Sequence, residues 1–314
     1  MYAEGHGTIK NYTKAIKWYK KSAQQGDSDA QFNLGVMYAE GRGTTKNYTQ
    51  AVKWYKKSAQ QGNSDAQSNL GIMYVYGHGV PQDYNEAFKW FSRSAKQGDF
   101  TAMSNLGVAY QNGQGVAKDP NKALELLQKS ADAGDVVGMS NLGMNYKYGH
   151  GVRQDYEKAL KWLTKAGLQG DSDAQYVLGT MYYEGKGVER NYQKAAEWFI
   201  KSAEQGDIDS QFNLGTMYYE GQGVEKDYFK ALTLFTKPAY QSNANAQINL
   251  GLMYAKGKGV HKDNIEAYKW FLLAEMNGKD ASAYKKLLEM VLKPAEIKKA
   301  QTRAKTFLQN EKKQ

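Results

Sequence analysis

The stretch DAQFNLGVMYAEGRG, from Asp29 to Gly43, returns almost unchanged 36 residues later as DAQSNLGIMYVYGHG, from Asp65 to Gly79. The dipeptide Leu-Gly and a Gly-x-Gly triplet recur at the same interval along the chain. The triplets begin at Gly5, Gly41, Gly77, Gly113, Gly149, Gly185, Gly221 and Gly257. A fixed period of roughly 20 to 50 residues, kept over many copies, indicates stacked repeats rather than two globular domains.

Each repeat is predicted to contain two helices, which we call helix A and helix B. In the repeat 27–62, helix A is expected to end near Glu40. The same helix is expected to begin after Asp27, because aspartate is a favoured N-cap residue. Gly26 ends the preceding helix, because glycine is favoured at the position that follows a helix. Ser28 with Gln31 offers an alternative start, a capping box.

Helix B of the same repeat is predicted to begin after Asn47 and to end near Gln61. Every equivalent of Asn47 is Asn or Asp, the residue types that cap helix N-termini well. Apolar residues recur at the spacing of one helix face in both helices, so each should bury one side.

Glycine lies in the middle of every helix A, as Gly35 does in the first full copy. Glycine inside a helix costs about 1 kcal/mol relative to alanine, so its recurrence needs a packing reason. We expect a ring to approach the bare backbone there. The candidate rings belong to Trp54 and its equivalents Trp18, Trp90, Trp162, Trp198 and Trp270.

The pattern AQ-x-x-LG-x-MY-x-x-G-x-G, followed by [ND]Y-x-x-A-x-x-W[YF], resembles the Sel-one-like repeat family, which is related to tetratricopeptide repeats. The resemblance covers residues 1 to about 278. It implies an all-α fold, an α/α solenoid or superhelix of 36-residue helix-turn-helix repeats in which helix A lines the concave side. It also implies C-terminal capping helices.

The expected organisation is a half repeat, seven full repeats and a cap. The half repeat spans 1–26 and contributes helix B only. The full repeats span 27–62, 63–98, 99–134, 135–170, 171–206, 207–242 and 243–278. The cap spans 279–314, with one helix near 280–291 and a second that Pro294 opens and that runs to about Gln309.

The N-terminal end is expected to be incompletely covered. Met1-Tyr2 aligns with Met37-Tyr38, so the chain begins inside a repeat and is interpreted as a partial chain. In the half repeat, Ile16, Trp18 and Tyr19 should be partly uncovered. We therefore expect fraying or end-to-end contact there. Late in the array, Pro238 and Ser242 replace a serine and a glycine, which predicts a kink or an altered connection.

Composition excludes several classes of function. The chain has no cysteine, which removes disulfides, thiolate metal sites and cysteine nucleophiles. No apolar run is long enough to span a membrane. The net charge is +10, but residues 279–314 hold ten Lys or Arg against four Asp or Glu, or +6 of it. The lysines of helix B, such as Lys53, should face solvent, which argues against a nucleic-acid groove.

No motif predicts catalysis, a cofactor or a metal ion. The Gly-x-Gly triplets lack the further residues of nucleotide-binding loops, and we interpret them as turns. His6, His78 and His150 share one loop position in alternate repeats, too far apart to bind one metal ion. Ser282 and Lys285 form an S-x-x-K motif, but its companion motifs in penicillin-binding enzymes are missing.

The resemblance places variable positions of helix A on the concave face, where a partner would bind. Another position of this face is asparagine in six of seven copies, including Asn141, Asn213 and Asn249, and such a ladder would either hold a peptide backbone or bond neighbouring repeats. Two further positions vary from copy to copy. In the fifth and sixth repeats they hold four large rings, those of Tyr176, Tyr183, Phe212 and Tyr219. In the middle repeats the equivalent residues are smaller or polar, such as Ser104, Gln111, Ser140 and Lys147. Rigid aromatics of this kind are typical of binding hot spots, although they would also pack against the next repeat.

We therefore predict a non-catalytic protein–protein interaction scaffold that binds a protein or peptide on the concave helix-A face. Two alternatives follow from the resemblance. One is an immunity protein that neutralises a secreted bacterial toxin, and the other is a β-lactam-hydrolysing enzyme. Nucleic acid is a less favoured partner. We favour the bacterial periplasm or secretion over the cytoplasm, although the sequence leaves the compartment open.

Overall fold

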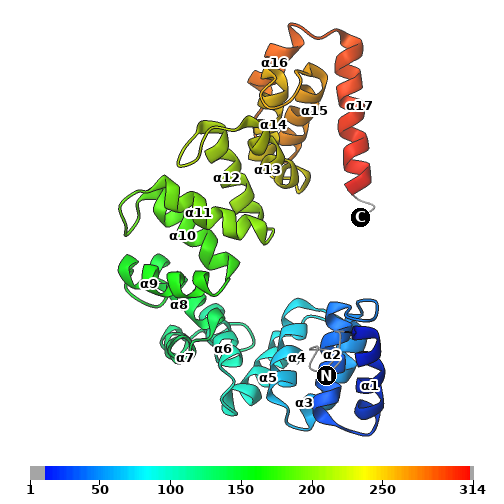
Figure 1. Cartoon of the computed structure of the whole chain (residues 1–314), viewed down its shortest axis with the longest axis vertical. Helices are drawn as coiled ribbons and strands as arrows, with labels where there is room; N and C mark the ends of the chain where they lie inside the picture. Colours follow the sequence, from blue (N-terminus) through cyan, green and yellow to red (C-terminus); the bar gives the residue numbers. More distant parts are fainter. Residues whose placement is uncertain (1–10, 312–314) are drawn as a thin grey trace. The chain divides into compact units, whose positions relative to one another are not determined.

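The computed structural model describes residues 11–311, and every regular element in that range is an α-helix (Figure 1). The helices B are α1 (Tyr12–Gln24), α3 (Tyr48–Gln60), α5 (Tyr84–Lys96), α7 (Pro120–Asp132), α9 (Tyr156–Leu168), α11 (Tyr192–Glu204), α13 (Tyr228–Tyr240) and α15 (Asn264–Met276). The helices A are α2 (Ser28–Glu40), α4 (Ser64–Tyr76), α6 (Phe100–Asn112), α8 (Val136–Tyr148), α10 (Ser172–Glu184), α12 (Ile208–Glu220) and α14 (Ala244–Lys256). The cap contributes α16 (Ser282–Glu289) and α17 (Pro294–Glu311).

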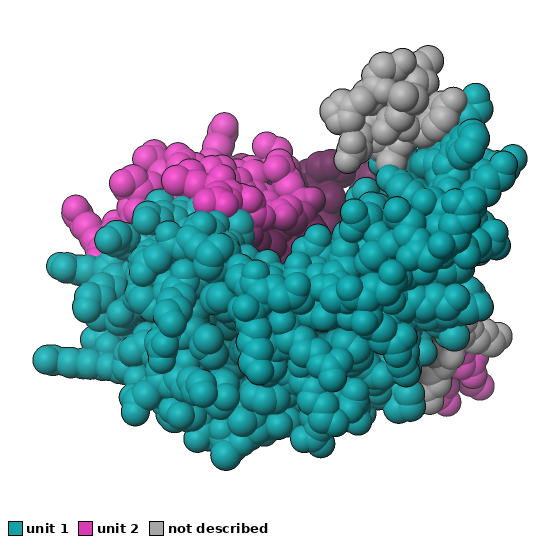
Figure 2. Space-filling model, turned by 90° about the horizontal axis from the view of Figure 1, so that it is seen from below, with its two compact units in different colours: residues 1–166 teal, residues 167–314 magenta. Residues whose placement is uncertain are grey.

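The chain divides into two compact units, residues 1–166 and residues 167–314 (Figure 2). In the first unit, neighbouring helices pack in chain order from α1 to α8. In the second unit, α10 to α15 do the same, and α16 and α17 both pack against α15. The predicted α-solenoid of helix pairs is confirmed, and in such arrays stability adds up along the stack.

The predicted helix starts are confirmed by their capping bonds. Asp27 Oδ1 accepts from the backbone nitrogen of Ala30 at 2.6 Å, and Asn47 Oδ1 accepts from that of Gln50 at 3.0 Å. At the other end, Gly41 follows α2 with φ of 77°, the left-handed conformation that glycine adopts most easily. The asparagines and aspartates therefore fix where each helix begins.

The capping box proposed for Ser28 and Gln31 does not form, because Asp27 already caps the helix. Gln31 instead donates to the carbonyl oxygen of Ala23 at 3.0 Å and accepts from Gln61 Nε2 at 2.7 Å. The same part-buried amide pairing recurs between Gln97 and Gln67 at 2.8 Å and in two later repeats. In these four repeats, the glutamine ladder ties the end of helix B to helix A of the same repeat.

The mid-helix glycines admit a large side chain, but not the tryptophan expected from the sequence. A Cβ atom on Gly35 would lie 2.5 Å from the ring of Tyr55, the residue after Trp54. Gly179 faces Phe199 in the same way, and Gly107 faces Leu127. The facing side chains are buried, at 2% exposure or less for Tyr55, Phe199 and Leu127. The packing reason for glycine is therefore correct, whereas the assignment to Trp54 is wrong by one residue.

The two ends of the described chain agree with the expectation except at Ile16. Ile16 is buried, contrary to the prediction, because it joins a core cluster with Leu34 and Met37. Trp18 is 60% exposed, as predicted. The rest of the half repeat, residues 1–10, lies outside the described range. At the other end both cap helices form as predicted.

The proline in α13 alters side-chain bonding more than the backbone. The helix keeps its length, and Ser242 takes the left-handed φ of 62° that glycine has elsewhere. The nitrogen of Asn243 still donates to the carbonyl oxygen of Pro238, as the equivalent residues do in earlier repeats. Gln211 Oε1 is buried without a hydrogen-bond partner among the described residues. One rung of the glutamine ladder is therefore missing here, while the predicted kink or altered connection stays a prediction.

Candidate functional site

The Gly-x-Gly loops hold neighbouring repeats together. Gly79 has φ of 72°, and a Cβ atom on it would lie 2.5 Å from the carbonyl carbon and oxygen of Tyr48, at the start of the preceding helix B. Gly43 approaches Tyr12 in the same way, and Gly223 approaches Tyr192. Only glycine combines this backbone conformation with such a close approach. The prediction that these loops are structural turns agrees with their geometry.

In three repeats, the residue between the two glycines lies over the aromatic ring that begins the preceding helix B: Arg42 over Tyr12, His78 over Tyr48 and Lys258 over Tyr228. The His78 ring stacks on that of Tyr48, with centroids 4.3 Å apart and planes 3° apart. Lys258 Nζ lies 4.6 Å from the centroid of the Tyr228 ring. Adjacent repeats therefore contact through one variable side chain and one ring, which the sequence analysis did not anticipate. A constant separation of 30 residues between the two was the available signal.

The four predicted aromatic residues lie in the second unit, on two helices A that contact each other. Tyr176 and Tyr183 belong to α10, and Phe212 and Tyr219 belong to α12. We call these four residues the aromatic face. All four are half-buried, because each ring packs on a helix-B ring of its own repeat. The centroid of Tyr176 is 6.2 Å from that of Phe199, for example.

The two tyrosines near the ends of these helices are fixed at both ends of the side chain. Tyr183 and Tyr219 each meet a helix-B tyrosine edge-on, with centroids 5.2 Å apart. Tyr183 Oη donates to Gln222 Oε1 at 3.0 Å, and Lys258 Nζ donates to Tyr219 Oη at 3.2 Å. Burial, and secondarily the charge of Glu220, raises the pKa of Tyr183. The face therefore presents two tyrosine rings that packing and hydrogen bonding hold in place.

Four members of the predicted asparagine ladder bond within their own helix rather than between repeats. Asn141 Nδ2 donates to the carbonyl oxygen of Val137, four residues earlier in α8, at 2.9 Å. Asn33, Asn69 and Asn105 make the same bond in their own helices. Asn213 and Asn249 are half-buried. Contacts between repeats fall instead to the glutamine ladder, two positions earlier in helix A.

The equivalent positions in the middle repeats take part in packing. Ser104 is fully buried, and its Oγ donates to Asp135 Oδ2 at 2.8 Å. Lys147, a predicted partner contact, is only 7% exposed, and its Nζ lies 4.9 Å from the centroid of the Tyr148 ring. Little of these two side chains is available to a partner.

The structure brings together no catalytic group at the other sequence motifs. Lys285 Nζ pairs with Glu275 Oε2 at 2.7 Å, and the backbone nitrogen of Ser282 donates to Asp280. Within residues 11–311, no group of three or more His, Asp or Glu is placed to hold a metal ion. His6 lies outside that range. None of the described helices has both the length and the apolarity needed to cross a membrane.

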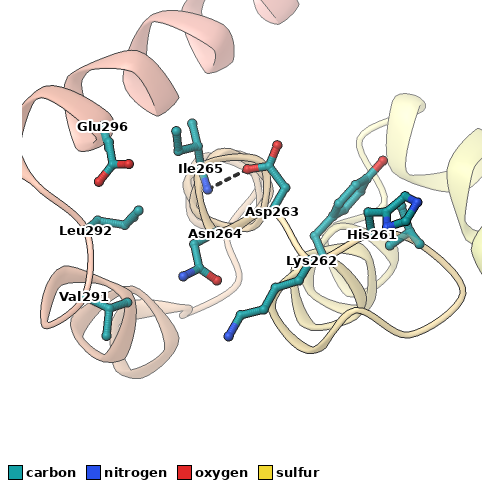
Figure 3. Close-up of a pocket in the computed structure, with 10 residues that line it drawn as sticks. His261, Lys262, Asp263, Asn264, Ile265, Val291, Leu292 and Glu296 are labelled. Carbon is teal, nitrogen blue, oxygen red and sulfur yellow. Dashed lines mark hydrogen bonds between the residues drawn. The ribbon is translucent and has the colours of Figure 1, made fainter.

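A separate hollow of about 530 Å³ lies where the last repeat meets the cap (Figure 3). Asn264 stands here at the position where earlier helices B receive a Gly-x-Gly loop. The turn that contains Val291 and Leu292 lies across from it instead. Asp263 caps α15 by accepting from the nitrogen of Ile265 at 2.9 Å. The hollow thus marks the end of loop docking, and its lining holds no nucleophile paired with a base.

The repeat geometry agrees with a comparison against known families. The model of the Sel1 repeat matches eight segments, at residues 1–27, 28–63, 64–99, 101–135, 136–171, 172–207, 208–243 and 244–279. The chain belongs to the Sel1 repeat family. Proteins of this family are typically protein-interaction scaffolds. The predicted resemblance is confirmed, while the repeat boundaries chosen from the sequence remain predictions.

Among solved structures, a Sel1 repeat protein from Oxalobacter formigenes is 34% identical, with a TM-score of 0.63 over 88% of this chain and 79% of that one. A protective antigen of uropathogenic Escherichia coli with the same fold is 31% identical, with a TM-score of 0.45 over 98% and 82%. An immunity protein of Pseudomonas aeruginosa, PA5088, is 26% identical, with a TM-score of 0.46 over 61% and 70%. The last two likenesses, with TM-scores below 0.5, support no functional conclusion. No curated protein matches the chain.

Proposed function

We propose that this Sel1 repeat protein is a non-catalytic scaffold that binds a protein or peptide partner through the aromatic face. The observation that supports the proposal is the placement of four half-exposed, rigid rings on two helices in contact. Aromatic side chains fixed in one rotamer lose little entropy on binding and give a large contact area.

The aromatic face is an addition to the fold rather than a requirement of it. Helices α6 and α8 adopt the same 13-residue form with Ser104, Gln111, Ser140 and Lys147 at the equivalent positions. Rings at these positions are therefore not needed to close a repeat. Their concentration on α10 and α12 supports a role in recognition.

The test compares two phenylalanines that occupy the same position in different repeats. Phe212 lies 5.8 Å from Phe235, and Phe32 lies 6.0 Å from Tyr55, measured between ring centroids. Phe212→Ala and Phe32→Ala should therefore lose similar packing. Captured proteins are identified by mass spectrometry after a pull-down from the native lysate. The affinity of the purified partner for each variant is then measured by calorimetry.

We expect Phe212→Ala to weaken partner binding by about tenfold or more, as hot-spot truncations do, and Phe32→Ala to leave it unchanged. Equal affinity of the two variants would overturn the proposal for the aromatic face. A toxin as the captured partner would identify the function as immunity. Hydrolysis of nitrocefin by the purified protein would overturn the non-catalytic assignment.

A further inference from the structure

Helix B carries tryptophan at one position in six of eight copies, and in five of these six a Lys or Arg follows three residues later. Trp198 lies against the preceding helix B, since a Cβ atom on Gly167 would be 3.2 Å from its Cζ3. A cation three residues later lies over the ring: Lys201 Nζ is 4.5 Å from the centroid of Trp198, and Lys57 Nζ is 4.9 Å from that of Trp54. The repeat thus provides an indole-shaped site between two helices B and beneath a cation.

Leucine takes this position in α13, and a pocket remains beside it. Leu234 packs on the cluster that includes Ala203 and Leu214. A pocket of about 440 Å³ is lined by these three residues together with Ile200, Glu204, Tyr218, Phe229, Lys230 and Thr233. Leu34 and Tyr38, the equivalents of Leu214 and Tyr218, belong to the surroundings of Trp54 in the first full repeat. The pocket therefore includes the space that an indole fills elsewhere.

Three further positions around the pocket depart from the other repeats, all toward less polar residues. Ile200 stands where the first five copies have Lys, Ser, Gln or Thr. Phe229 stands where the first six copies have Thr, Asn, Glu or Gln. Thr233 stands where the other seven copies have Lys or Glu. Phe229 is 69% exposed. The other repeats fold with polar groups at most of these places, so the change is not needed for folding. Four departures that converge on one pocket indicate a ligand.

We propose that this pocket binds the indole side chain of a tryptophan presented by a protein partner. The inference rests on the proposed protein-binding function but uses a different surface. Lys237 keeps the position of the cation that lies over the indole elsewhere, and its Nζ would lie 3.5 Å from a Cβ atom on Gly206, which follows α11. Lys230 lies at the pocket wall, and the Glu204 carboxylate there can accept the indole N–H. Leu234 and Phe229 supply the apolar walls that bind the two sides of the ring.

The test uses the capped tripeptide acetyl-Gly-Trp-Gly-amide as a probe and acetyl-Gly-Leu-Gly-amide as its control. Saturation-transfer NMR reports which peptide protons contact the full chain. We expect the indole protons to gain signal with the wild-type protein and the leucine peptide to gain none. Leu234→Trp fills the pocket from within and should reduce the indole signal at least tenfold. Leu126→Trp, the matched change in another repeat, should leave it unchanged.

A second variant tests the pocket independently, in case Leu234→Trp fails to fold. Ile200→Lys with Phe229→Thr restores the residue types of other repeats on an exposed surface, and it should also reduce the indole signal at least tenfold. An equal indole signal in all variants, or none with the wild type, would overturn the proposal. Loss of partner binding in Phe212→Ala with no indole signal would refute this pocket alone. An indole signal with no captured partner would refute the aromatic face alone.

Discussion

The helices A of the third and fourth repeats, α6 and α8, and those of the fifth and sixth, α10 and α12, have the same length and caps but different surfaces. In the first pair, Ser104 and Ser140 are buried. In the second pair, Tyr176 and Phe212 are half-exposed at the same positions. The repeat therefore tolerates a serine or a large ring there without a change in backbone.

The positions common to both regions are those that join repeats. Gly107 and Gly179 both lie against a buried helix-B side chain, and Gly115 and Gly223 both lie against the backbone of the preceding helix B. Changes at the loop glycines should affect the two regions alike, whereas changes at the mid-helix glycines should differ only as far as the facing side chain differs. Changes at the surface positions should affect only one, and the four predictions below test this division.

The largest effect is expected from the second glycine of the Gly-x-Gly loop. Gly115→Ala and Gly223→Ala each place a Cβ atom against the carbonyl of Tyr84 or Tyr192, at φ of 71° and 68°. Left-handed backbone costs about 1–2 kcal/mol for alanine, and overpacking adds about 1–3 kcal/mol. We expect each variant to lose about 3 kcal/mol in urea denaturation. A loss in only one of the two would break the comparison.

Alanine substitution of the mid-helix glycines should lower stability less than substitution of the loop glycines, and by different amounts in the two regions. A Cβ atom on Gly179 would lie 2.6 Å from the Phe199 ring, whereas one on Gly107 would lie 2.8 Å from Leu127 Cγ. A leucine can rotate away more easily than a rigid ring. After the gain in helix propensity of about 1 kcal/mol, we expect Gly179→Ala to lose about 1–2 kcal/mol and Gly107→Ala less. Thermal unfolding measures both, and the reverse order would contradict this reasoning.

Removal of the Tyr183 hydroxyl group should lower the stability of the fold by less than either glycine substitution. Tyr183→Phe keeps the ring contact with Tyr192 but leaves Gln222 without its donor. A half-exposed hydrogen bond of this kind contributes about 0.5–1.5 kcal/mol. We expect a loss within that range by chemical denaturation. A loss well above it would show that the hydroxyl organises the loop as well as bonding to it.

The smallest effect concerns pH, and we test it near the aromatic face. Burial, with the neighbouring charges of Asp171 and Asp207, raises the pKa of Asp173. A raised carboxyl pKa means that folding favours the protonated acid, so this contribution is present at low pH and is lost as pH rises through the folded pKa. Asp173→Asn should raise stability at pH 7 by less than about 1 kcal/mol. The gain should vanish below about pH 4, the range of an unperturbed aspartate. An equal gain at pH 3, measured by thermal melts, would refute the assignment.

Most of the fold could be predicted because its signals are local. Asp27 and Asn47 mark helix starts by residue type alone, and Pro294 marks the last helix. The choice between Trp54 and Tyr55 as the ring beside Gly35 was not local. Adjacent residues on a helix point about 100° apart, and only the crossing of two helices decides which one faces the glycine. The same limit made Gln31 look like a cap rather than a link between repeats.

The location of the candidate site could be predicted from the sequence, but the contacts of its side chains could not. Sequence variation pointed to Tyr183 and Tyr219, yet their bonds to Gln222 and Lys258 join residues 39 positions apart. The pocket beside Leu234 was less visible still. Its walls come from three helices, and its signal is the joint departure of Ile200, Phe229 and Thr233 from the other copies. Such a pattern becomes meaningful only when the helices are placed in space.

The docking of each Gly-x-Gly loop on the preceding helix B has a genetic consequence. The junctions at Gly43, Gly79, Gly115, Gly223 and Gly259 use the same backbone contact, so removing or duplicating a multiple of 36 residues between two of them regenerates an intact junction. Unequal crossing-over within the gene would therefore yield arrays that still fold, with the aromatic repeats moved closer to either end. Selection on what such arrays bind could then act without first having to restore the architecture.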